Sequence, residues 1–115
     1  MRYTYALALN ELNRAGEARE ELEQAVRLDP QFGRAWYNLG LARNAAGEHE
    51  KAIEALARAE ALDPQNAQAP YAAATIYAHL GRTEEAAQAA KRALKIDPGY
   101  AEATDLLRAL SGADR

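Results

Sequence analysis

Apolar residues recur along the chain at intervals of three and four positions, the spacing that gathers side chains on one face of an α-helix. Stripes of this kind predict helices over residues 16–28, 50–62 and 84–96, and further helices that begin near residues 33, 67 and 101. The last of these helices is expected to stop at Gly112. The clearest stripe is Ala52, Leu56, Ala59 and Leu62. The pattern therefore predicts an all-α chain.

Asp-Pro pairs mark a repeat of 34 residues, because they stand at Asp29-Pro30, Asp63-Pro64 and Asp97-Pro98. Proline disfavours helical backbone in the residue before it, so each pair is expected to end a helix. The turn inside each unit is predicted at a residue type that tolerates a positive φ, namely Asn13, Gly47 and Gly81. A shift of one period also aligns apolar columns: Leu28, Leu62 and Ile96; Ala25, Ala59 and Ala93; Leu22, Leu56 and Ala90; Ala18, Ala52 and Ala86.

The second unit resembles the tetratricopeptide repeat family, whose unit is a helix–turn–helix of the same length. The residues that carry the resemblance are Trp36, Leu39, Gly40, Gly47, Ala52, Ala59 and Pro64. Arg43 stands where the family usually has tyrosine. Pro70 replaces the tryptophan of the third unit near the start of a helix, where a missing N–H costs least. The resemblance implies a right-handed α-solenoid of three antiparallel helix–turn–helix repeats plus a C-terminal capping helix.

This resemblance covers nearly the whole chain and implies a single repeat domain over residues 1–115. Repeat 1 spans about 1–32, repeat 2 about 33–66, repeat 3 about 67–100, and the capping helix about 101–112. The period places Met1 inside a helix, whereas the capping helix has a polar outer face with Glu102, Asp105 and Arg108. We therefore expect an N-terminally truncated first repeat cut from a longer protein. The alternative is a natural short chain whose first helix is exposed or paired.

The first helix of each repeat carries two stripes. Trp36, Leu39, Gly40 and Arg43 are assigned to packing, and the small residue at Gly40 lets two helices approach closely, as do Ala6 and Ala74 one period away. A second stripe lies on another side of the same helix: Tyr37, Leu41 and Asn44, with Tyr3, Leu7 and Asn10 one period earlier and Tyr71, Thr75 and Ala78 one period later. The first helices thus carry more apolar surface than one packing face needs.

In the family, the second stripe lines the concave groove where peptide ligands lie, and tyrosine suits recognition because it combines contact area with a hydroxyl. The predicted peptide-binding groove is Tyr3, Leu7, Asn10, Arg34, Tyr37, Asn38, Leu41, Asn44, Gln68, Tyr71, Thr75 and His79. The tyrosines have a structural alternative, which is packing against the next repeat. For Leu7 and Leu41 packing is favoured. Asn38 and Asn44 are expected to be solvent-exposed.

One ligand class of the family is not expected. Co-chaperone members grip a C-terminal carboxylate with lysine, asparagine and arginine side chains. The aligned positions here are Tyr3, Leu7, Asn38, Gln68 and Ala72, and Asn38 alone matches. The positive charge of that clamp is therefore missing.

Composition adds mainly exclusions. The net charge is −3 with no Lys/Arg run, so nucleic acid is not an expected partner. Cysteine is absent, Ser111 is the one serine, and the two histidines belong to no metal-ligand pattern; His49 is expected to be exposed. We therefore predict no enzyme activity, no cofactor and no metal. No apolar run is long enough to insert into a membrane and residues 1–9 lack a signal-peptide pattern, so a soluble, cytoplasmic location is favoured over others, although the compartment is open.

Charged residues on the outer helix faces are expected to form i,i+4 ion pairs, Glu23 with Arg27 and Glu54 with Arg58.

Two functions remain. The first is a protein-interaction scaffold that binds a peptide or partner segment, of unknown identity, in the groove. The second is an assembly module that stacks or self-associates through the N-terminal repeat, because Tyr5, Leu9 and Leu12 would form an exposed apolar helix face.

Overall fold

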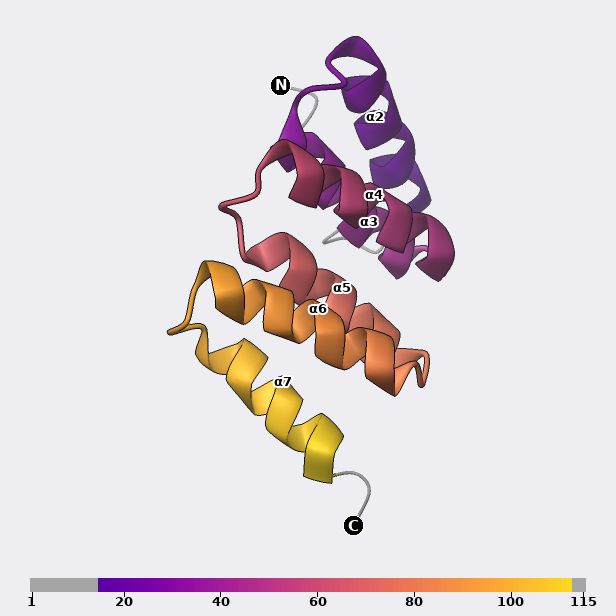
Figure 1. The fold of residues 1–115 in the computed structure, drawn as a ribbon. Coiled ribbons are helices and arrows are strands. Elements are labelled where there is room, and N and C mark those ends of the chain that lie inside the picture. The colour runs from indigo at the N-terminus through magenta and orange to yellow at the C-terminus, as the bar shows by residue number, and fades with distance from the viewer. Residues whose placement is uncertain (1–14, 113–115) are drawn as a thin grey trace. The chain divides into compact units, whose positions relative to one another are not determined.

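The computed structural model describes residues 15–112, and within this range the chain is helical with no strand. The helices, labelled in Figure 1, are α2 (Ala15–Leu28), α3 (Gly33–Ala45), α4 (His49–Leu62), α5 (Gln68–His79), α6 (Thr83–Ile96) and α7 (Ala101–Gly112). The helical-repeat fold expected from the sequence is confirmed. The predicted ends at Leu28, Leu62 and Ile96 agree with the structure, and each of these helices begins one residue earlier than predicted. The first helix of repeat 1 and its turn at Asn13 lie outside the described residues.

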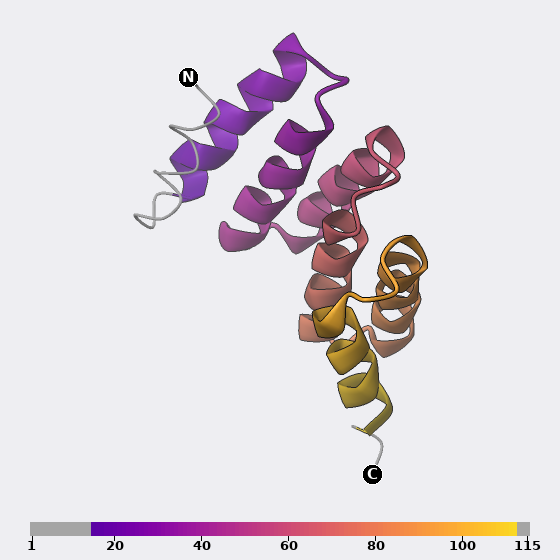
Figure 2. The ribbon, with the colours of Figure 1, turned by 90° about the vertical axis from the view of Figure 1, so that its left-hand side faces the viewer.

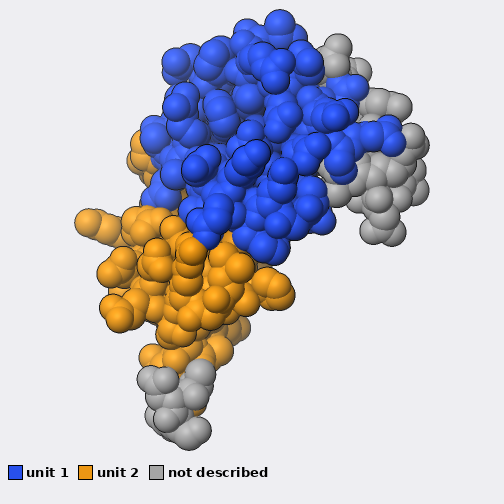
Figure 3. Space-filling view, turned by 90° about the vertical axis from the view of Figure 1, so that its right-hand side faces the viewer, with its two compact units in different colours: residues 1–63 blue, residues 64–115 orange. Residues whose placement is uncertain are grey.

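The chain divides into two compact units, residues 1–63 (unit 1) and residues 64–115 (unit 2), shown in two colours in Figure 3. In unit 1, α3 packs against both α2 and α4. In unit 2, α6 packs against α5 and α7. Figure 2 shows α3–α4 and α5–α6 as two antiparallel hairpins, one in each unit.

The turns inside the two hairpins have the same construction. Gly47 has φ +85° and Gly81 has φ +79°, in the left-handed region that glycine adopts at little cost. Glu48 N donates to Arg43 O at 2.8 Å, and Arg82 N donates to Tyr77 O at 2.8 Å. These bonds across five residues satisfy carbonyls at the helix end, as in the Schellman motif. The two glycine turns predicted from the sequence are therefore confirmed.

The Asp-Pro pairs end the second helices as predicted. Asp29, Asp63 and Asp97 each donate the last backbone hydrogen bond of their helix, to the carbonyls of Ala25, Ala59 and Ala93. The carboxylate of Asp97 then accepts a hydrogen bond from Gly99 N at 3.1 Å, and that of Asp29 accepts one from Gln31 N at 3.2 Å. A side chain that bonds the backbone two residues later holds a turn. The Asp-Pro pairs thus produce the structural repeat by ending each second helix at the same position of the unit.

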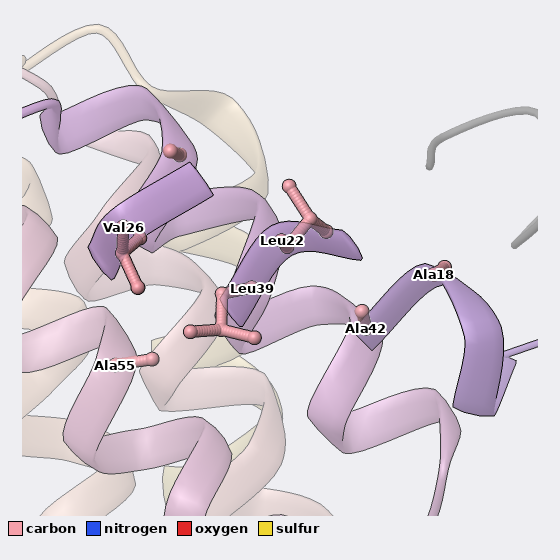
Figure 4. Packing of buried hydrophobic residues seen from close by; sticks show 7 residues of the cluster. Ala18, Leu22, Val26, Leu39, Ala42 and Ala55 are labelled. Atoms are coloured by element: carbon pink, nitrogen blue, oxygen red, sulfur yellow. The ribbon is translucent and has the colours of Figure 1, made fainter. Parts of the chain in front are cut away.

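Small and branched side chains fill the core of unit 1. Its buried cluster, drawn in Figure 4, is Ala18, Leu22, Val26, Ala35, Leu39, Ala42 and Ala55. Gly40 marks the closest helix approach, because a Cβ at this position would lie 2.7 Å from Leu56 Cγ and 3.1 Å from Ala52 O. The prediction of a close helix approach at Gly40 is therefore confirmed.

Leu28 departs from its sequence column. The alignment with Leu62 and Ile96 predicts an inward side chain, but Leu28 is 78% exposed. The reason is the phase of α2, which buries Ala18, Leu22 and Val26 at intervals of four. Leu28 follows Val26 by two residues, which places it on the other side of the helix, at its last residue. The predicted inward stripe of this helix was therefore wrong at Leu28.

One buried cluster of unit 2 lies where the start of α5, the end of α6 and α7 meet. This cluster joins Ala67, Ala93 and Ala103, and further side chains pack against it: Tyr71, Leu94, Ile96 and Tyr100. Pro70 is fully buried as the third residue of α5. Its missing N–H falls among the first four of the helix, which have no partner within the helix, so the proline is tolerated there as predicted.

Candidate peptide-binding surface

Trp36 of the α3 packing stripe contacts both the α2–α3 connection and α4. Trp36 Nε1 donates to Pro30 O at 2.9 Å, and the guanidinium of Arg58 lies 5.0 Å from the centre of the Trp36 ring. This distance is within the range of a cation–π interaction. Arg58 therefore covers Trp36, and the ion pair predicted between Glu54 and Arg58 is not formed.

Arg43, which replaces the family's tyrosine, belongs to a charged network. Its Nη2 lies 3.5 Å from Glu23 Oε2 on α2, and its Nη1 donates to Lys51 O on α4 at 3.2 Å. Arg19 joins from α2, with Nη1 3.1 Å from Glu48 Oε1. Hydrogen bonding to Glu48 and the charge of its carboxylate raise the pKa of Arg19 above its ordinary value, so this guanidinium stays charged. Glu23 thus pairs with Arg43 across helices and with Arg19 at 4.0 Å within α2. The sequence had predicted Arg27 as its partner instead.

The second stripe of α3 forms a surface that we call the α3 face: Arg34, Tyr37, Asn38, Leu41 and Asn44. Arg34 is exposed, whereas Tyr37 and Leu41 are half-buried. Tyr37 and Leu41 stand four residues apart, on a different side of the helix from Leu39 and Gly40. Neither Tyr37 nor Leu41 belongs to the buried cluster of unit 1 formed by the described residues, so the α3 face offers partly accessible apolar area.

Asn38 is not the solvent-exposed residue that the sequence suggested, because it is 7% exposed. Its Nδ2 donates to Arg34 O at 3.0 Å. A buried amide needs such a bond to offset the loss of water, and the carbonyl one turn earlier in the helix supplies it. Asn38 is thus held by its own helix.

Asn44 and His49 meet across the α3–α4 turn, with 2.5 Å between Asn44 Oδ1 and His49 Nδ1. The amide oxygen can only accept, so His49 Nδ1 is the donor. Both residues are half-buried, so the expectation that they are exposed was wrong. The contact arises because the Gly47 turn folds the end of α3 back against the start of α4.

The second stripe of α5 forms the α5 face: Gln68, Tyr71, Thr75 and His79. Gln68, Thr75 and His79 are exposed, and Thr75 Oγ1 donates to Ala72 O at 2.7 Å. Tyr71 is half-buried, with its ring centre 5.0 Å from that of Tyr100 and the two planes at 37°. Tyr71 therefore packs against the residue that precedes α7, which is the structural alternative weighed for these tyrosines. Whether Tyr71 also contacts a ligand stays a prediction.

The remaining predicted groove residues, Tyr3, Leu7 and Asn10, lie outside the described residues, as do Tyr5, Leu9 and Leu12 of the predicted assembly face.

Sequence reasoning missed Tyr100. This residue lines a hollow of about 630 Å³ between the start of α5 and the start of α7, which we call the Tyr100 hollow. Its lining residues are Gln65, Asn66, Ala67, Gln68, Ile96, Asp97, Gly99, Tyr100, Ala101 and Glu102. The available signal was an aromatic residue placed directly between an Asp-Pro pair and the closing helix.

Between residues 15 and 112, no three His, Asp or Glu side chains are placed to hold a metal ion together. Over the same range, each helix is too short or too polar to cross a bilayer.

The paired antiparallel helices, glycine turns and 34-residue register define a helical-repeat protein of the helix–turn–helix class. Tetratricopeptide repeat models match residues 3–67 and 43–110. The chain therefore belongs to the tetratricopeptide repeat family. A search of curated protein sequences finds no significant match.

Solved structures show the same fold. The crystal structure of MamA has a TM-score of 0.91 and 27% identity, over 98% of this chain and 66% of MamA, so the chain spans about two thirds of that protein. The Yersinia enterocolitica type III secretion chaperone SycD, in complex with a peptide of the translocator YopD, has a TM-score of 0.91 and 19% identity, over 99% and 92% of the chains. The first tetratricopeptide domain of Spaghetti (RPAP3), bound to the HSP90 peptide SRMEEVD, has a TM-score of 0.88 and 22% identity, over 97% and 91%.

Proposed function

We propose that this chain is a non-catalytic interaction module that binds peptide segments of a partner protein on the α3 face of unit 1 and on the α5 face of unit 2, each taken as a surface of its own unit. The observation that carries the proposal is the pair Tyr37 and Leu41, which are half-buried one turn apart on α3 and lie outside the buried cluster of the described residues of unit 1. Apolar area of this kind beside polar groups is typical of peptide-recognition surfaces. Arg34 and Asn44 supply the polar groups at either end of the stripe.

The fold neighbours support the general role. The SycD structure contains a peptide of YopD, and the Spaghetti structure contains an HSP90 peptide. Peptide binding is thus a use to which this fold is put, and here it is inferred from the surface rather than from identity, which is 19% and 22% for these two.

The ligand is not expected to be held by a carboxylate clamp. Asn38 is the one residue that matches the clamp, and its side-chain amide already donates to Arg34 O. Gln68 and Ala72 bring no positive charge at the aligned positions of α5. We therefore expect recognition of an internal segment through its apolar side chains.

The test is a random-peptide selection against the chain and against Tyr37→Ala. Tyr37 is preferred to Tyr71 because Tyr71 packs against Tyr100, so its truncation would also disturb the fold. The matched control is Leu28→Ala, which removes an exposed apolar side chain from the same unit. A motif that enriches on the parent and on Leu28→Ala but not on Tyr37→Ala supports the proposal. Enrichment that ignores Tyr37, with unchanged helical circular dichroism, would contradict it.

A second candidate function, self-association, is favoured by one observation. Leu28 is 78% exposed and Phe32 is 39% exposed on either side of the first described Asp-Pro pair. Exposed large apolar residues close together commonly mark an interaction site. Light scattering over a concentration series should then show mass that rises with concentration in the parent and not in Leu28→Ser. A constant monomer mass would remove this candidate.

A further inference from the structure

The Tyr100 hollow has the size of a ligand site. Its volume of about 630 Å³ lies within the range of small-ligand pockets in proteins, roughly 300–1,000 Å³. Its walls come from the loop before α5, the end of α6 and the α6–α7 connection. Gln68 of the α5 face is one of the lining residues, so the hollow adjoins the proposed peptide-binding surface.

The charged residues that line the hollow are both acidic. Asp97 and Glu102 both line the hollow, and no lysine, arginine or histidine does. Neither carboxylate forms an ion pair with any residue in 15–112. Asp97 uses Oδ1 to accept from Gly99 N and keeps a second oxygen. Side-chain amides of Gln65, Asn66 and Gln68 supply further acceptors.

The aromatic wall is held in place. The Tyr100 ring packs against Tyr71 with 5.0 Å between ring centres, and both rings pack on the buried alanines of the unit 2 core. Tyrosine rings attract cations at their faces, and arginine stacks on them especially well. A pocket that joins carboxylates, amide oxygens and a fixed tyrosine is complementary to a cationic side chain with several N–H donors.

The repeat register shows which part of this chemistry recurs, because Asp97 aligns with Asp29 and Asp63, whereas Glu102 has no acidic equivalent. Glu102, Gln68 and Arg34 occupy the same position one period apart, and all are exposed. The charge at this position therefore changes from positive in repeat 2 to neutral in repeat 3 and negative at the capping helix. Tyr100 shares its column with Asn66 and Phe32, and it is the one tyrosine of the three. The capping helix thus adds Glu102 to a site whose Asp97 and Tyr100 stand at the end of repeat 3.

We propose that the Tyr100 hollow binds an arginine or lysine side chain of the partner peptide, which makes α7 a specificity element as well as a cap. This proposal rests on the proposed function. It gives the ligand a basic residue at the position that lies against unit 2. Glu102 and Asp97 attract the cation, and Tyr100 contacts its alkyl or planar part.

The test uses a defined probe. The ¹⁵N-labelled chain is titrated with N-acetyl-arginine methylamide, and the backbone amides of Gln68, Gly99 and Glu102 are followed by NMR. N-acetyl-citrulline methylamide, which has the same shape without the charge, is the control ligand. We expect arginine to shift these signals and citrulline to leave them in place, with an effect that weakens as salt is added.

A pair of variants tests whether the charge of Glu102 holds the arginine. Glu102→Gln should weaken the arginine titration about three- to fivefold, in keeping with one exposed ion pair. Glu84→Gln is the matched control, because Glu84 is exposed in the first turn of α6 and does not line the hollow. Equal shifts from arginine and citrulline, or equal weakening by Glu102→Gln and Glu84→Gln, would overturn the site.

Peptide selection separates the two proposals. A motif that depends on Tyr37 and contains a basic residue lost on Glu102→Gln supports both. A Tyr37-dependent motif with no basic position overturns the hollow and leaves the interaction function standing. Arginine-specific shifts without any enriched peptide would retain the cation site and contradict the peptide-binding function.

Discussion

The α3–α4 hairpin of unit 1 and the α5–α6 hairpin of unit 2 share a 34-residue register and fill it differently. At the closest helix approach, unit 1 combines Gly40 with Leu56, whereas the equivalent residues of unit 2 are Ala74 and Ala90. All four are buried. The large residue of one hairpin faces the smallest possible partner, and the other hairpin pairs two alanines. Gly40 and Leu56 together carry four side-chain carbons and Ala74 and Ala90 carry two, so the comparison teaches that the same register tolerates different side-chain volumes at this level.

A second difference lies at the start of the two hairpins. Unit 1 has Trp36, which is bonded to Pro30 O and covered by Arg58, whereas unit 2 has the fully buried Pro70 at the same position. What the hairpins keep in common is the backbone: a positive-φ glycine, a bond across five residues at the turn, and an aspartate that ends the second helix. Side-chain chemistry is therefore free to diverge between repeats while the backbone ends hold the fold.

The largest expected effect is that of Leu56→Ala, which removes the large member of the unit 1 pair. Because Leu56 is 1% exposed, the change should lower the free energy of unfolding by about 3 kcal/mol, through lost transfer energy and a cavity beside Gly40. Urea unfolding followed by circular dichroism measures it. A loss below about 1 kcal/mol would mean that the helices collapse onto Gly40 and that unit 1 can adopt the alanine packing of unit 2.

Gly40→Ala should lower the free energy of unfolding by a smaller amount, about 1–2 kcal/mol, because the new Cβ would lie 2.7 Å from Leu56 Cγ. The gain in helix propensity, up to about 1 kcal/mol, offsets part of the strain. In the double variant Gly40→Ala, Leu56→Ala, the strain should vanish, so the two changes should be strongly non-additive. Additive losses in the urea experiment would show that the volumes are not coupled.

Turn glycines should behave alike in both hairpins. Gly47→Ala and Gly81→Ala should each cost about 1 kcal/mol, because a Cβ is strained at positive φ and no neighbouring atom lies within 4 Å of either added Cβ. Native-state hydrogen exchange should show faster exchange confined to the hairpin that carries the change. A cost twice as large in one hairpin would contradict the view that their turns are equivalent.

The fold could be predicted from the sequence because its determinants are local. Asp-Pro pairs and turn glycines act on their own backbone, so the helix ends at Leu28, Leu62 and Ile96 followed from residue type and period alone. Leu28 was misplaced because the column assigned its direction by register, whereas α2 buries Ala18, Leu22 and Val26 and leaves its last residue exposed.

The candidate surface was harder to predict, since its state depends on contacts between elements. The burial of Asn38 follows from how its helix packs, although its bond is local. The Tyr71–Tyr100 contact joins residues almost a full repeat apart, and no single-helix periodicity indicates it. Arg43 shows the same limit, because its partner Glu23 stands on a different helix.

The smallest expected effect concerns that charged network. Glu23→Gln should lower the free energy of unfolding by about 0.5 kcal/mol at low salt, because the Glu23 and Arg43 side chains are 30% and 17% exposed and solvent screens their attraction. The loss should shrink at 1 M salt, where the screening length is about 3 Å. Lys91→Gln is the matched control, since Lys91 is exposed and stands two periods after Glu23. If both variants lose the same amount and neither depends on salt, the pairing of Arg43 with Glu23 contributes no specific stability, and Arg43 would fill its position through its alkyl chain and its bond to Lys51 O alone.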